Sequence, residues 1–325
     1  MKAAVRTKYG IPGDLSIKEL PMPVPSKNEL LIRVYAATVN RSDCHVLSGK
    51  PYVMRAFTGI FRPKAATIGT DFSGEVVEIG GEVKGFNPGD KLMGFGGPFH
   101  CSAQAQYLAI DEKKAKKITA PLPENISYED AVACLEGAVY SAGVSKSGIG
   151  AGQKVMVYGA SGAIGIACVQ FFKNLGAYVT AVCKEEHRPL MNALDADKIV
   201  DYTKQDFTKD EERYDFIFDA VGKTSFIKCK HLLNKGGRFT SSNGIINFFL
   251  VPVTKLFGTR RVIFPPSLGI KGALELTKKY LEEGRFKAII DRKYPLQEIA
   301  VAYQYVQRGQ KVGTVVINME TTSEP

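Results

Sequence analysis

The residues of this sequence best suited to chemistry are three glycines, Gly159, Gly162 and Gly165, which separate two apolar runs. The run before them, 155–158, is typical of a short buried parallel strand, and the apolar residues after them recur at helical spacing. A turn without Cβ atoms lets backbone N–H groups approach a pyrophosphate, and the following helix adds the positive end of its dipole. This order predicts a dinucleotide-binding turn, although a closely packed turn without a ligand has the same pattern.

The length and composition limit the classes of protein. A chain of 325 residues with 45% hydrophobic and 23% charged residues predicts a globular protein of two domains. The start of the chain lacks the apolar core of a secretory signal, and the most apolar run, 245–253, is shorter than the roughly 20 residues of a membrane span. The six cysteines form no C-x-x-C pair, which favours reduced thiols. We therefore expect a cytoplasmic protein that does not act at a membrane.

The net charge of +10 suggests a nucleic-acid partner, but the basic residues are spread along the chain. The densest cluster, 113–117, has no interleaved aromatic residues and follows Asp111 and Glu112. A solvated face explains this cluster better than a nucleic-acid site does, with attraction of anionic cofactors as a secondary effect. No nucleic-acid partner is expected.

The expected fold class is α/β. Residues 1–122 are strand-like and rich in turns, which predicts a β-sandwich or barrel-like module. Residues 123–267 alternate between apolar strands and helices, which predicts a doubly wound parallel sheet covered on both faces. After that the pattern changes again and ends in a strand at 314–318 and a loose tail.

The order of these parts resembles the medium-chain dehydrogenase/reductase superfamily, and within it the zinc-less quinone oxidoreductase-like branch. The resemblance implies a GroES-like catalytic domain formed by residues 1–122 and 268–325. It further implies a Rossmann cofactor-binding domain formed by 123–267, with the catalytic cleft between the two domains. The segments that carry it are 37–43, 68–74, 85–90, 160–165, 199–202 and 290–296.

The same resemblance implies that the protein has no zinc. Zinc enzymes of the superfamily have a cysteine where this chain has Asn40, a histidine where it has Thr70, and a second cysteine that corresponds to Cys134. One such ligand cannot hold a catalytic zinc ion, which needs three protein ligands and an open position. Adjacent residues rarely chelate one ion, so an alternative set is not expected to bind metal either. That set is Cys44, His45 and His100.

The end of the second Rossmann strand distinguishes the two nicotinamide cofactors. An NAD-specific domain carries an acidic residue there, about 20 residues past the glycines, to bind the ribose hydroxyls. This chain has Cys183 and then Lys184, and a cation favours the 2′-phosphate of NADPH. His187 and Arg188 are close enough in sequence to contribute. In similar reductases a tyrosine at the position of Tyr202 lies beside that phosphate.

Other interpretations of this loop remain open. Glu185 and Glu186 would bind the ribose if the loop were shifted by one residue, and Lys184 and His187 would otherwise belong to a solvated loop. NADPH is nevertheless the expected cofactor. The predicted cofactor-binding residues are Gly159, Ala160, Ser161, Gly162, Ala163, Ile164, Gly165, Lys184, His187, Tyr202, Val221, Asn243 and Gly244.

Without zinc to polarise an oxygen atom, hydrogen bonds must activate the hydride acceptor. This favours quinones and α,β-unsaturated ketones or aldehydes over simple alcohols. Asn40 stands where a zinc ligand is lost, and its amide N–H is a predicted donor to the substrate carbonyl. Tyr52 matches a tyrosine at the cleft mouth of related reductases and is predicted to donate a proton or to stack on a ring. Alternatively, Asn40 caps a turn and Tyr52 is a surface aromatic.

The predicted function is that of an NADPH-dependent quinone or enone oxidoreductase, with alcohol or aldehyde dehydrogenase activity as an alternative. A non-catalytic protein that binds NADPH as a structural ligand is the competing class, because cofactor binding is common to both. The apolar run 245–251 suits a pocket wall or lid, or the contact of a homodimer. The expected partners are therefore a small electrophilic substrate and a second copy of the chain.

Overall fold

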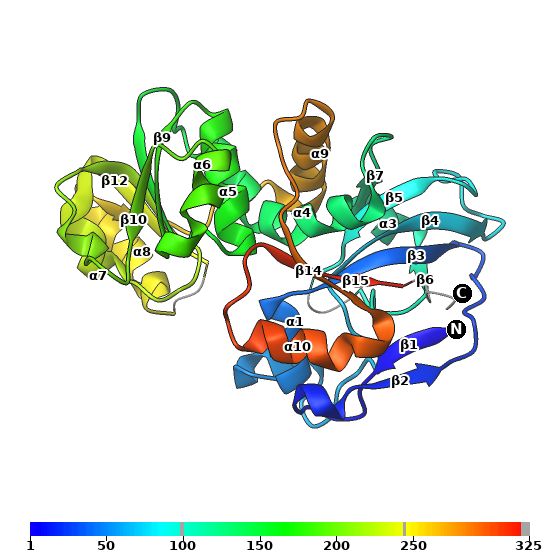
Figure 1. Ribbon diagram of the computed structural model, residues 1–325. Helices are drawn as coiled ribbons and strands as arrows, with labels where there is room; N and C mark the ends of the chain where they lie inside the picture. Colours follow the sequence, from blue (N-terminus) through cyan, green and yellow to red (C-terminus); the bar gives the residue numbers. More distant parts are fainter. Residues whose placement is uncertain (98–100, 243–244, 320–325) are drawn as a thin grey trace. The chain divides into compact units, whose positions relative to one another are not determined.

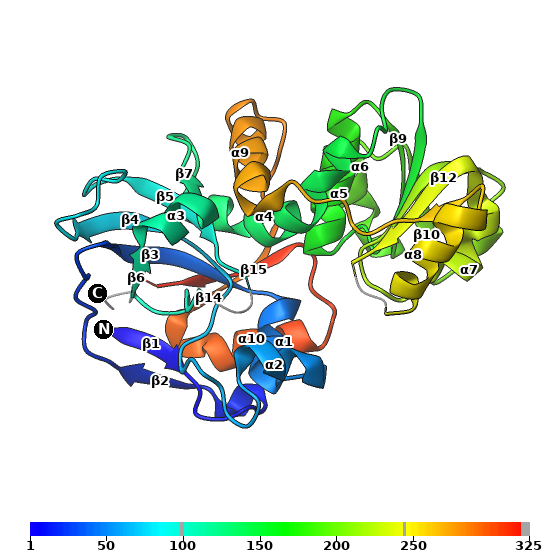
Figure 2. The same ribbon diagram turned by 180° about the vertical axis from the view of Figure 1, so that it is seen from behind.

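The computed structural model describes residues 1–97, 101–242 and 245–319. The chain divides into two compact units, one formed by Met1–Glu136 with Ile270–Pro325 and the other by Gly137–Gly269. Figure 1 colours them along the sequence, and Figure 2 shows them from behind. Both ends of the chain thus build the first unit, and the boundary before the second unit falls later than the expected residue 122.

The first unit is built on one large sheet and a small ribbon. Its strands are β1 (Lys2–Val5), β2 (Ser16–Glu19), β3 (Glu29–Val39), β4 (Asp71–Ile79), β5 (Lys91–Phe95), β6 (Tyr107–Asp111), β7 (Thr119–Pro121), β14 (Ile290–Pro295) and β15 (Thr314–Asn318). The large sheet has the order β14-β15-β3-β4-β5-β7, and β6 also pairs with β3. Its pairs are antiparallel except β14 with β15. The antiparallel pair of β1 and β2 forms the ribbon.

Helices with most of their residues in the first unit lie on both sides of this sheet (Figures 1 and 2). They are α1 (Arg41–Ser48), α2 (Arg55–Thr58), α3 (Glu112–Ile118), α4 (Tyr128–Ser141), α9 (Gly269–Glu282) and α10 (Ile299–Gln307). In the core, Leu30 and Ile32 of β3 belong to the same apolar cluster as Tyr303 and Val306 of α10. The apolar stripe of α10 therefore ties the end of the chain to its beginning.

The second unit contains a parallel sheet. Its strands are β8 (Lys154–Tyr158), β9 (Tyr178–Cys183), β10 (Lys198–Asp201), β11 (Tyr214–Asp219), β12 (Leu233–Ser241) and β13 (Arg261–Val262). Their order is β10-β9-β8-β11-β12-β13, and every neighbouring pair is parallel. Counted from β8 as the first strand, this is the 3-2-1-4-5-6 order of a Rossmann fold. The predicted doubly wound sheet is confirmed.

The helices of this unit are α5 (Ala163–Asn174), α6 (Arg188–Ala193), α7 (Phe226–Cys229) and α8 (Ile245–Phe257). Helix α5 is buried from Gly165 to Phe172, because its sequence is apolar on nearly all sides. The run predicted as a pocket wall or dimer contact belongs to α8, where Phe249, Val253 and Leu256 are exposed. None of the helices in the described ranges has the length and apolar character needed to span a membrane.

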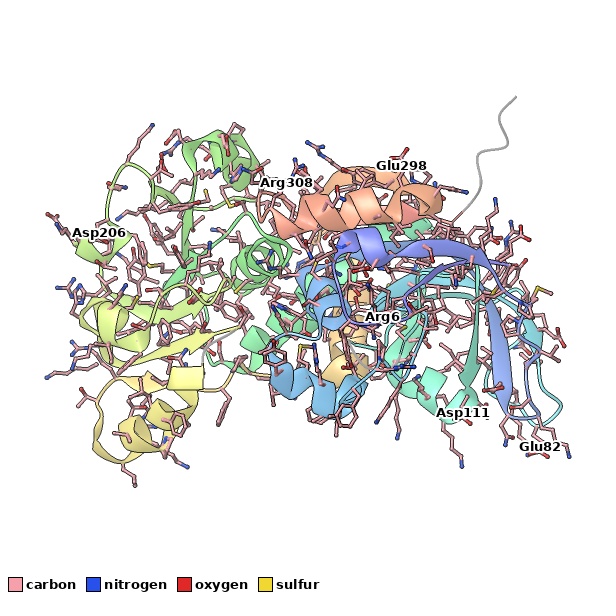
Figure 3. All side chains as sticks on the ribbon, turned by 90° about the horizontal axis from the view of Figure 1, so that it is seen from below. Arg6, Glu82, Asp111, Asp206, Glu298 and Arg308 are labelled. Atoms are coloured by element: carbon pink, nitrogen blue, oxygen red, sulfur yellow. The ribbon has the colours of Figure 1, made fainter. Side chains whose placement is uncertain are left out.

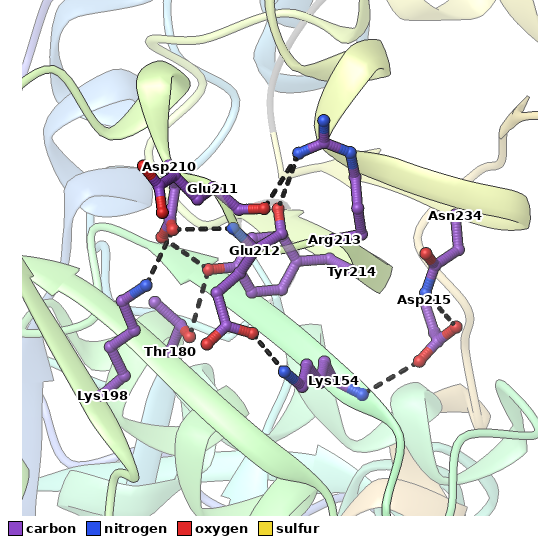
Figure 4. A network of polar contacts seen from close by, with 10 residues as sticks. All are labelled: Lys154, Thr180, Lys198, Asp210, Glu211, Glu212, Arg213, Tyr214, Asp215 and Asn234. Atoms are coloured by element: carbon purple, nitrogen blue, oxygen red, sulfur yellow. Dashed lines mark hydrogen bonds and ion pairs between the residues drawn. The ribbon is translucent and has the colours of Figure 1, made fainter.

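A polar network occupies the amino-terminal edge of the parallel sheet (Figure 4). Asp215 accepts hydrogen bonds from the Lys154 N–H and from Asn234 Nδ2, each at 2.9 Å. Asp210 accepts from Lys198 Nζ and from the Tyr214 hydroxyl, each at 2.7 Å. These hydrogen bonds join the first residues of neighbouring strands and stabilise this edge of the sheet. A ligand is expected at the opposite edge, where the strands end.

Candidate cofactor and active site

The turn after β8 lies where the strand order of the second unit reverses. Strand β9, which follows next in the chain, lies on one side of β8, and β11 lies on the other. Ligands of open parallel sheets bind at the carboxyl ends of the strands next to such a point. The N–H groups of Gly159 and Ala160 both donate to Val182 O, at 3.0 and 3.1 Å. These bonds tie the glycine turn to the end of β9 at the edge where a dinucleotide is expected.

Gly159 and Val221 meet at this point. Gly159 has a φ of +78°, and a Cβ on it would lie 2.0 Å from Val221 Cγ2. Asp219 Oδ1, at the end of β11, accepts hydrogen bonds from the N–H groups of Val221 at 2.9 Å and Gly222 at 2.8 Å. Burial raises the pKa of Asp219, while hydrogen bonds to its charged form oppose the rise. The structure thus brings two predicted cofactor residues together and fixes one of them through Asp219.

The other two glycines of the turn have different surroundings. A Cβ on Gly162 would have a single atom within 4 Å in the described residues, Gly159 O at 3.7 Å. A Cβ on Gly165 would lie 2.2 Å from Gly159 O and 2.8 Å from Ala160 Cα. The space at Gly162 is therefore available to a ligand, whereas the space at Gly165 is taken by the packing of α5 on the turn.

The first turn of α5 has the properties of an anion site. Gly162 is its N-cap, and no side chain in the described residues caps the helix there. Backbone N–H groups of Ala163 and Ile164, with the positive end of the helix dipole, therefore point toward the space beside Gly162. Together with Ser161, these residues form a cradle that fits a pyrophosphate. The residues present suit a dinucleotide cofactor.

Lys184, His187 and Tyr202 come from the carboxyl ends of the adjacent strands β9 and β10. The Tyr202 N–H donates to Cys183 O at 3.3 Å, which joins the two strand ends. Lys184 Nζ lies 3.2 Å from Glu186 Oε1, and His187 Nε2 lies 3.4 Å from the same oxygen. The structure gathers the three residues predicted to bind the 2′-phosphate and places Glu186 between two of them.

The second acidic residue of this loop, Glu185, is also paired. Arg188 donates to both of its carboxylate oxygens, with Nη2 at 3.0 Å from Oε2, and Lys204 Nζ lies 3.8 Å away. The hydrogen bonds from Arg188 lower the pKa of Glu185 more than its partial burial raises it. An acidic side chain that binds ribose hydroxyls must accept their hydrogen bonds, and here both candidates already hold cations. The predicted residues Asn243 and Gly244 lie outside the described residues.

In the first unit, the positions that correspond to zinc ligands do not suit zinc. Asn40 and Thr70 are buried and offer an amide and a hydroxyl group. Cys134 is the one soft ligand at the three positions, and a catalytic zinc ion needs three protein ligands. Within the described ranges, no three His, Cys, Asp or Glu side chains are arranged to hold a metal ion, and His100 lies outside them. The donor groups at these positions therefore do not fit a catalytic zinc ion.

Asn40 belongs instead to a buried hydrogen-bond network. Its Nδ2 donates to Thr38 Oγ1 at 2.6 Å and to Asp71 Oδ2 at 3.2 Å, and Thr38 Oγ1 donates to Asp71 Oδ1. Asn40 Oδ1 is buried without a hydrogen-bond partner among the described residues. In this structure the Asn40 amide N–H is engaged within the network, and its role as a donor to a substrate carbonyl stays a prediction. Asn40 is also the N-cap residue of α1.

Two buried carboxyl groups adjoin Asn40. Asp43 Oδ2 accepts hydrogen bonds from the Asn40 N–H at 2.7 Å and from Thr70 Oγ1 at 3.4 Å. Burial, with Asp71 and Glu136 nearby, raises the pKa of Asp43 well above its usual value. Burial also raises the pKa of Asp71 to about 8, against the hydrogen bonds that it accepts. Both shifts favour the protonated forms, because burial penalises two negative charges side by side.

Tyr52 lies on the surface of the first unit, with 67% of its area exposed. The Arg55 guanidinium carbon is 4.9 Å from the centroid of its ring and 4.5 Å from that of Tyr9. Two cation–π contacts thus hold the segment against the ribbon side of the unit. The exposed ring is free to stack, and a catalytic role for Tyr52 stays a prediction.

Several site residues were missed in the sequence. Asp219 could have been found from its place, because an acidic residue that ends an apolar strand before small residues is typical of a turn at the ligand edge. Asp43, three residues after Asn40, matches the spacing of a capping residue. Nothing in the local pattern of Asp71 shows that it will be buried against these groups. Its role depends on the pairing of β3 with β4.

The two glycines give a matched test of the cradle. Gly162→Ala is expected to weaken NADPH binding at least about tenfold, or 1.4 kcal/mol, because its methyl group enters the ligand space. Gly165→Ala adds the same methyl group against the turn and is expected to cost about 1–3 kcal/mol of stability. Fluorescence titration with NADPH and thermal unfolding measure the two effects. Wild-type NADPH affinity in Gly162→Ala would show that the turn binds no cofactor.

Asp71 predicts a dependence of stability on pH. Its pKa is about 8 in the folded protein, above about 3.9 in an unfolded chain. The folded state therefore binds a proton that the unfolded state loses, so stability falls as pH rises from 4 to 8, by up to about 1.4 kcal/mol per pH unit. Asp71→Asn should flatten this slope. Urea unfolding at several pH values checks it, and equal slopes in both proteins would contradict the raised pKa.

Known protein families match both units. The family described as alcohol dehydrogenase GroES-like domain matches residues 26–124, and the family described as zinc-binding dehydrogenase matches residues 194–317. The first match lies within the first unit. The second covers much of the parallel-sheet unit and continues into the closing segment of the first. Together they account for the arrangement in which both chain ends build one unit.

Relatives match over nearly the whole chain. The NADPH-dependent alkenal/one oxidoreductase of Arabidopsis thaliana chloroplasts is 28% identical over 330 residues, which cover 98% of this chain and 79% of the relative. A chloroplastic quinone-oxidoreductase of Triphysaria versicolor is 28% identical, with 92% of each chain covered. The quinone oxidoreductase from Coxiella burnetii has the same fold, with a TM-score of 0.86, 24% identity and coverage of 98% and 99%. The chain belongs to the medium-chain dehydrogenase/reductase superfamily of oxidoreductases.

Proposed function

We propose that this protein is an NADPH-dependent oxidoreductase that transfers hydride to a quinone or an α,β-unsaturated carbonyl compound without zinc. The observation that carries the proposal is the open space beside Gly162 at the uncapped start of α5. A nucleotide pyrophosphate needs such a space together with backbone N–H groups. The printed names of the alkenal/one and quinone oxidoreductase relatives support the class of acceptor.

The preference for NADPH rests on the loop after β9. It presents Lys184 and His187 at a position where an acidic residue would select NADH. Glu186 lies 3.2 Å from the Lys184 ammonium and 3.4 Å from His187 Nε2, and a 2′-phosphate would compete with it for both side chains. A dianionic phosphate makes charge-assisted hydrogen bonds with Lys184 that the hydroxyl of NADH cannot replace.

When bound, the reduced nicotinamide supplies the hydride. The chain's own contribution in the second unit is to hold the pyrophosphate with backbone N–H groups and to fix Val221 through Asp219. In the first unit, Asp71 and Thr38 hold the Asn40 side chain rigidly, so Asn40 acts as a positioning residue. The groups at the zinc-ligand positions do not fit a metal ion that would polarise a substrate oxygen. Conjugated acceptors, which are already electrophilic, therefore suit the site better than simple alcohols. We assign contact with the acceptor ring to Tyr52.

We also infer that the chain forms a homodimer in the cytoplasm. Phe249 and Leu256 expose 73% and 74% of their surface on α8, which supports a contact with a second copy there. The six cysteines are buried free thiols, which supports a reducing compartment. A monomer in analytical ultracentrifugation would exclude the dimer, and recovery of the protein in another compartment by cell fractionation would exclude the location.

Turnover distinguishes the oxidoreductase from a non-catalytic NADPH-binding protein. With NADPH, quinones and conjugated enones are expected to be reduced, while simple alcohols with NADP⁺ react at least about a hundredfold more slowly, because nothing here lowers the pKa of an alcohol. Loss of absorbance at the NADPH band measures the rate. A faster reaction with alcohols would support a dehydrogenase, and tight NADPH binding with no turnover across the panel would support a structural role for the cofactor.

Lys184 tests the choice of cofactor. Lys184→Ala is expected to weaken NADPH binding about tenfold or more, the loss of about 1.5–3 kcal/mol for a charge-assisted bond, and to leave NADH binding nearly unchanged. Lys235→Ala removes an equal charge from an exposed site at the start of β12 and serves as the control. Isothermal titration with both cofactors measures the ratio. Equal weakening of NADPH and NADH would place the phosphate elsewhere.

A further inference from the structure

A cavity in the first unit is lined by Arg6, a buried cation with no paired carboxylate among the described residues. The cavity has a volume of about 220 Å³, and its wall includes Arg6, Asp43, Lys64 and Thr70. It is smaller than the roughly 300–1,000 Å³ of pockets for drug-sized ligands, so it suits a small molecule. Figure 3 shows Arg6 in the interior of the unit, away from Glu82 and Glu298 at its outline.

Arg6 is buried almost completely, with 3% of its area exposed. Its backbone N–H donates to Ala66 O at 2.9 Å, and one nitrogen of its guanidinium, Nη1, donates to Val46 O. Nε is buried without a hydrogen-bond partner, and the described residues include no carboxylate paired with this cation. Its cation–π contact is with Tyr9, at 5.3 Å from the ring centroid. A guanidinium keeps its charge in proteins, so burying this one costs free energy of folding unless an anion pairs with it.

The rest of the cavity suits an anion as well. Lys64 is exposed and adds a second positive charge at the rim. Thr67 and Ser102 contribute hydroxyl groups to the wall, and Ser102 Oγ donates to Thr67 O at 3.3 Å. Asp43 would repel an anion if it were ionised, but burial and neighbouring carboxyl groups raise its pKa well above the usual value.

We propose that this cavity binds the carboxylate of a small organic acid, with Arg6 as its counter-ion and Lys64 at its rim. Arginine binds carboxylates through parallel N–H groups, which gives both strength and orientation. The inference goes beyond hydride transfer, because a carboxylate accepts no hydride; the cavity wall shares Asp43 and Thr70 with the hydrogen-bond network beside Asn40.

Butyrate and butyramide are the probes, because they have the same size and only butyrate is charged. Neither can accept hydride, so their binding is independent of the reductase activity. Isothermal titration into the full chain, in a buffer of large anions, is expected to show butyrate binding at least about tenfold more tightly than butyramide, as for a charge-assisted contact. Equal binding of both probes, or no binding of butyrate, would overturn the proposal.

Variants locate the site. Arg6→Gln should weaken butyrate binding at least about tenfold, and Lys64→Gln about two- to fivefold, since rim charges count less than buried ones. Lys18→Gln removes the same charge from an exposed position of β2 outside the cavity wall and should leave the affinity within about twofold. If neither Arg6→Gln nor Lys64→Gln changed the affinity for butyrate, the anion would have to bind elsewhere.

Arg6 is buried, so Arg6→Gln requires a second variant in case it fails to fold. Ala65 is exposed and lines the cavity, whereas its exposed neighbour Ala66 does not. Ala65→Leu should fill part of the cavity and weaken butyrate binding at least about fivefold, while Ala66→Leu should not, because only the first adds volume in the ligand's space. Equal affinities in the two leucine variants would contradict the proposed cavity.

Discussion

The reversal of strand order between β8 and β11 is the constraint on which the second unit depends. It opens the carboxyl edge of the sheet at one place, where the glycine turn after β8 meets Val221 after β11. Two requirements then act on one turn: α5 must pack closely at Gly165, and a phosphate must approach at Gly162. A side chain at Gly165 would prevent the close packing of α5, and one at Gly162 would block the phosphate. Asp219 keeps the facing loop in place by accepting its backbone N–H groups.

In the first unit, buried polar side chains form a hydrogen-bond network with one another. Where zinc enzymes of the superfamily place metal ligands, this chain has a buried network of Asn40, Thr38 and Asp71, with Asp43 beside it. A metal ion would stabilise negative charge by its own charge, whereas here burial raises the pKa values of both carboxyl groups and favours their neutral forms. The network that stands in place of the metal ligands keeps this region compact and polar. Without a metal ion, the substrate must be electrophilic through its own conjugation.

Charge is distributed unevenly between these two regions. In the second unit the acidic residues of the loop after β9 are matched by cations, with Glu185 on Arg188 and Glu186 on Lys184. In the first unit Arg6 is buried without such a match among the described residues. In the proposed cofactor site, a phosphate would replace one of these carboxylates. At Arg6 a positive charge lies in a low dielectric, where an incoming anion gains the most.

The sequence by itself determined the parallel sheet, the glycine turn and the amide and hydroxyl groups at two zinc-ligand positions, because these depend on local periodicity and on residue types at short spacing. Lys184 and His187 were predicted from the absence of an acidic residue at the end of the second Rossmann strand, and Tyr202 from the resemblance to similar reductases. Only the tertiary structure decided that the Asn40 amide bonds Asp71 as well as Thr38, since Asp71 reaches it through the pairing of β3 with β4. The isolation of Arg6 was likewise hidden, because burial and the lack of a counter-ion among the described residues arise from contacts between distant segments.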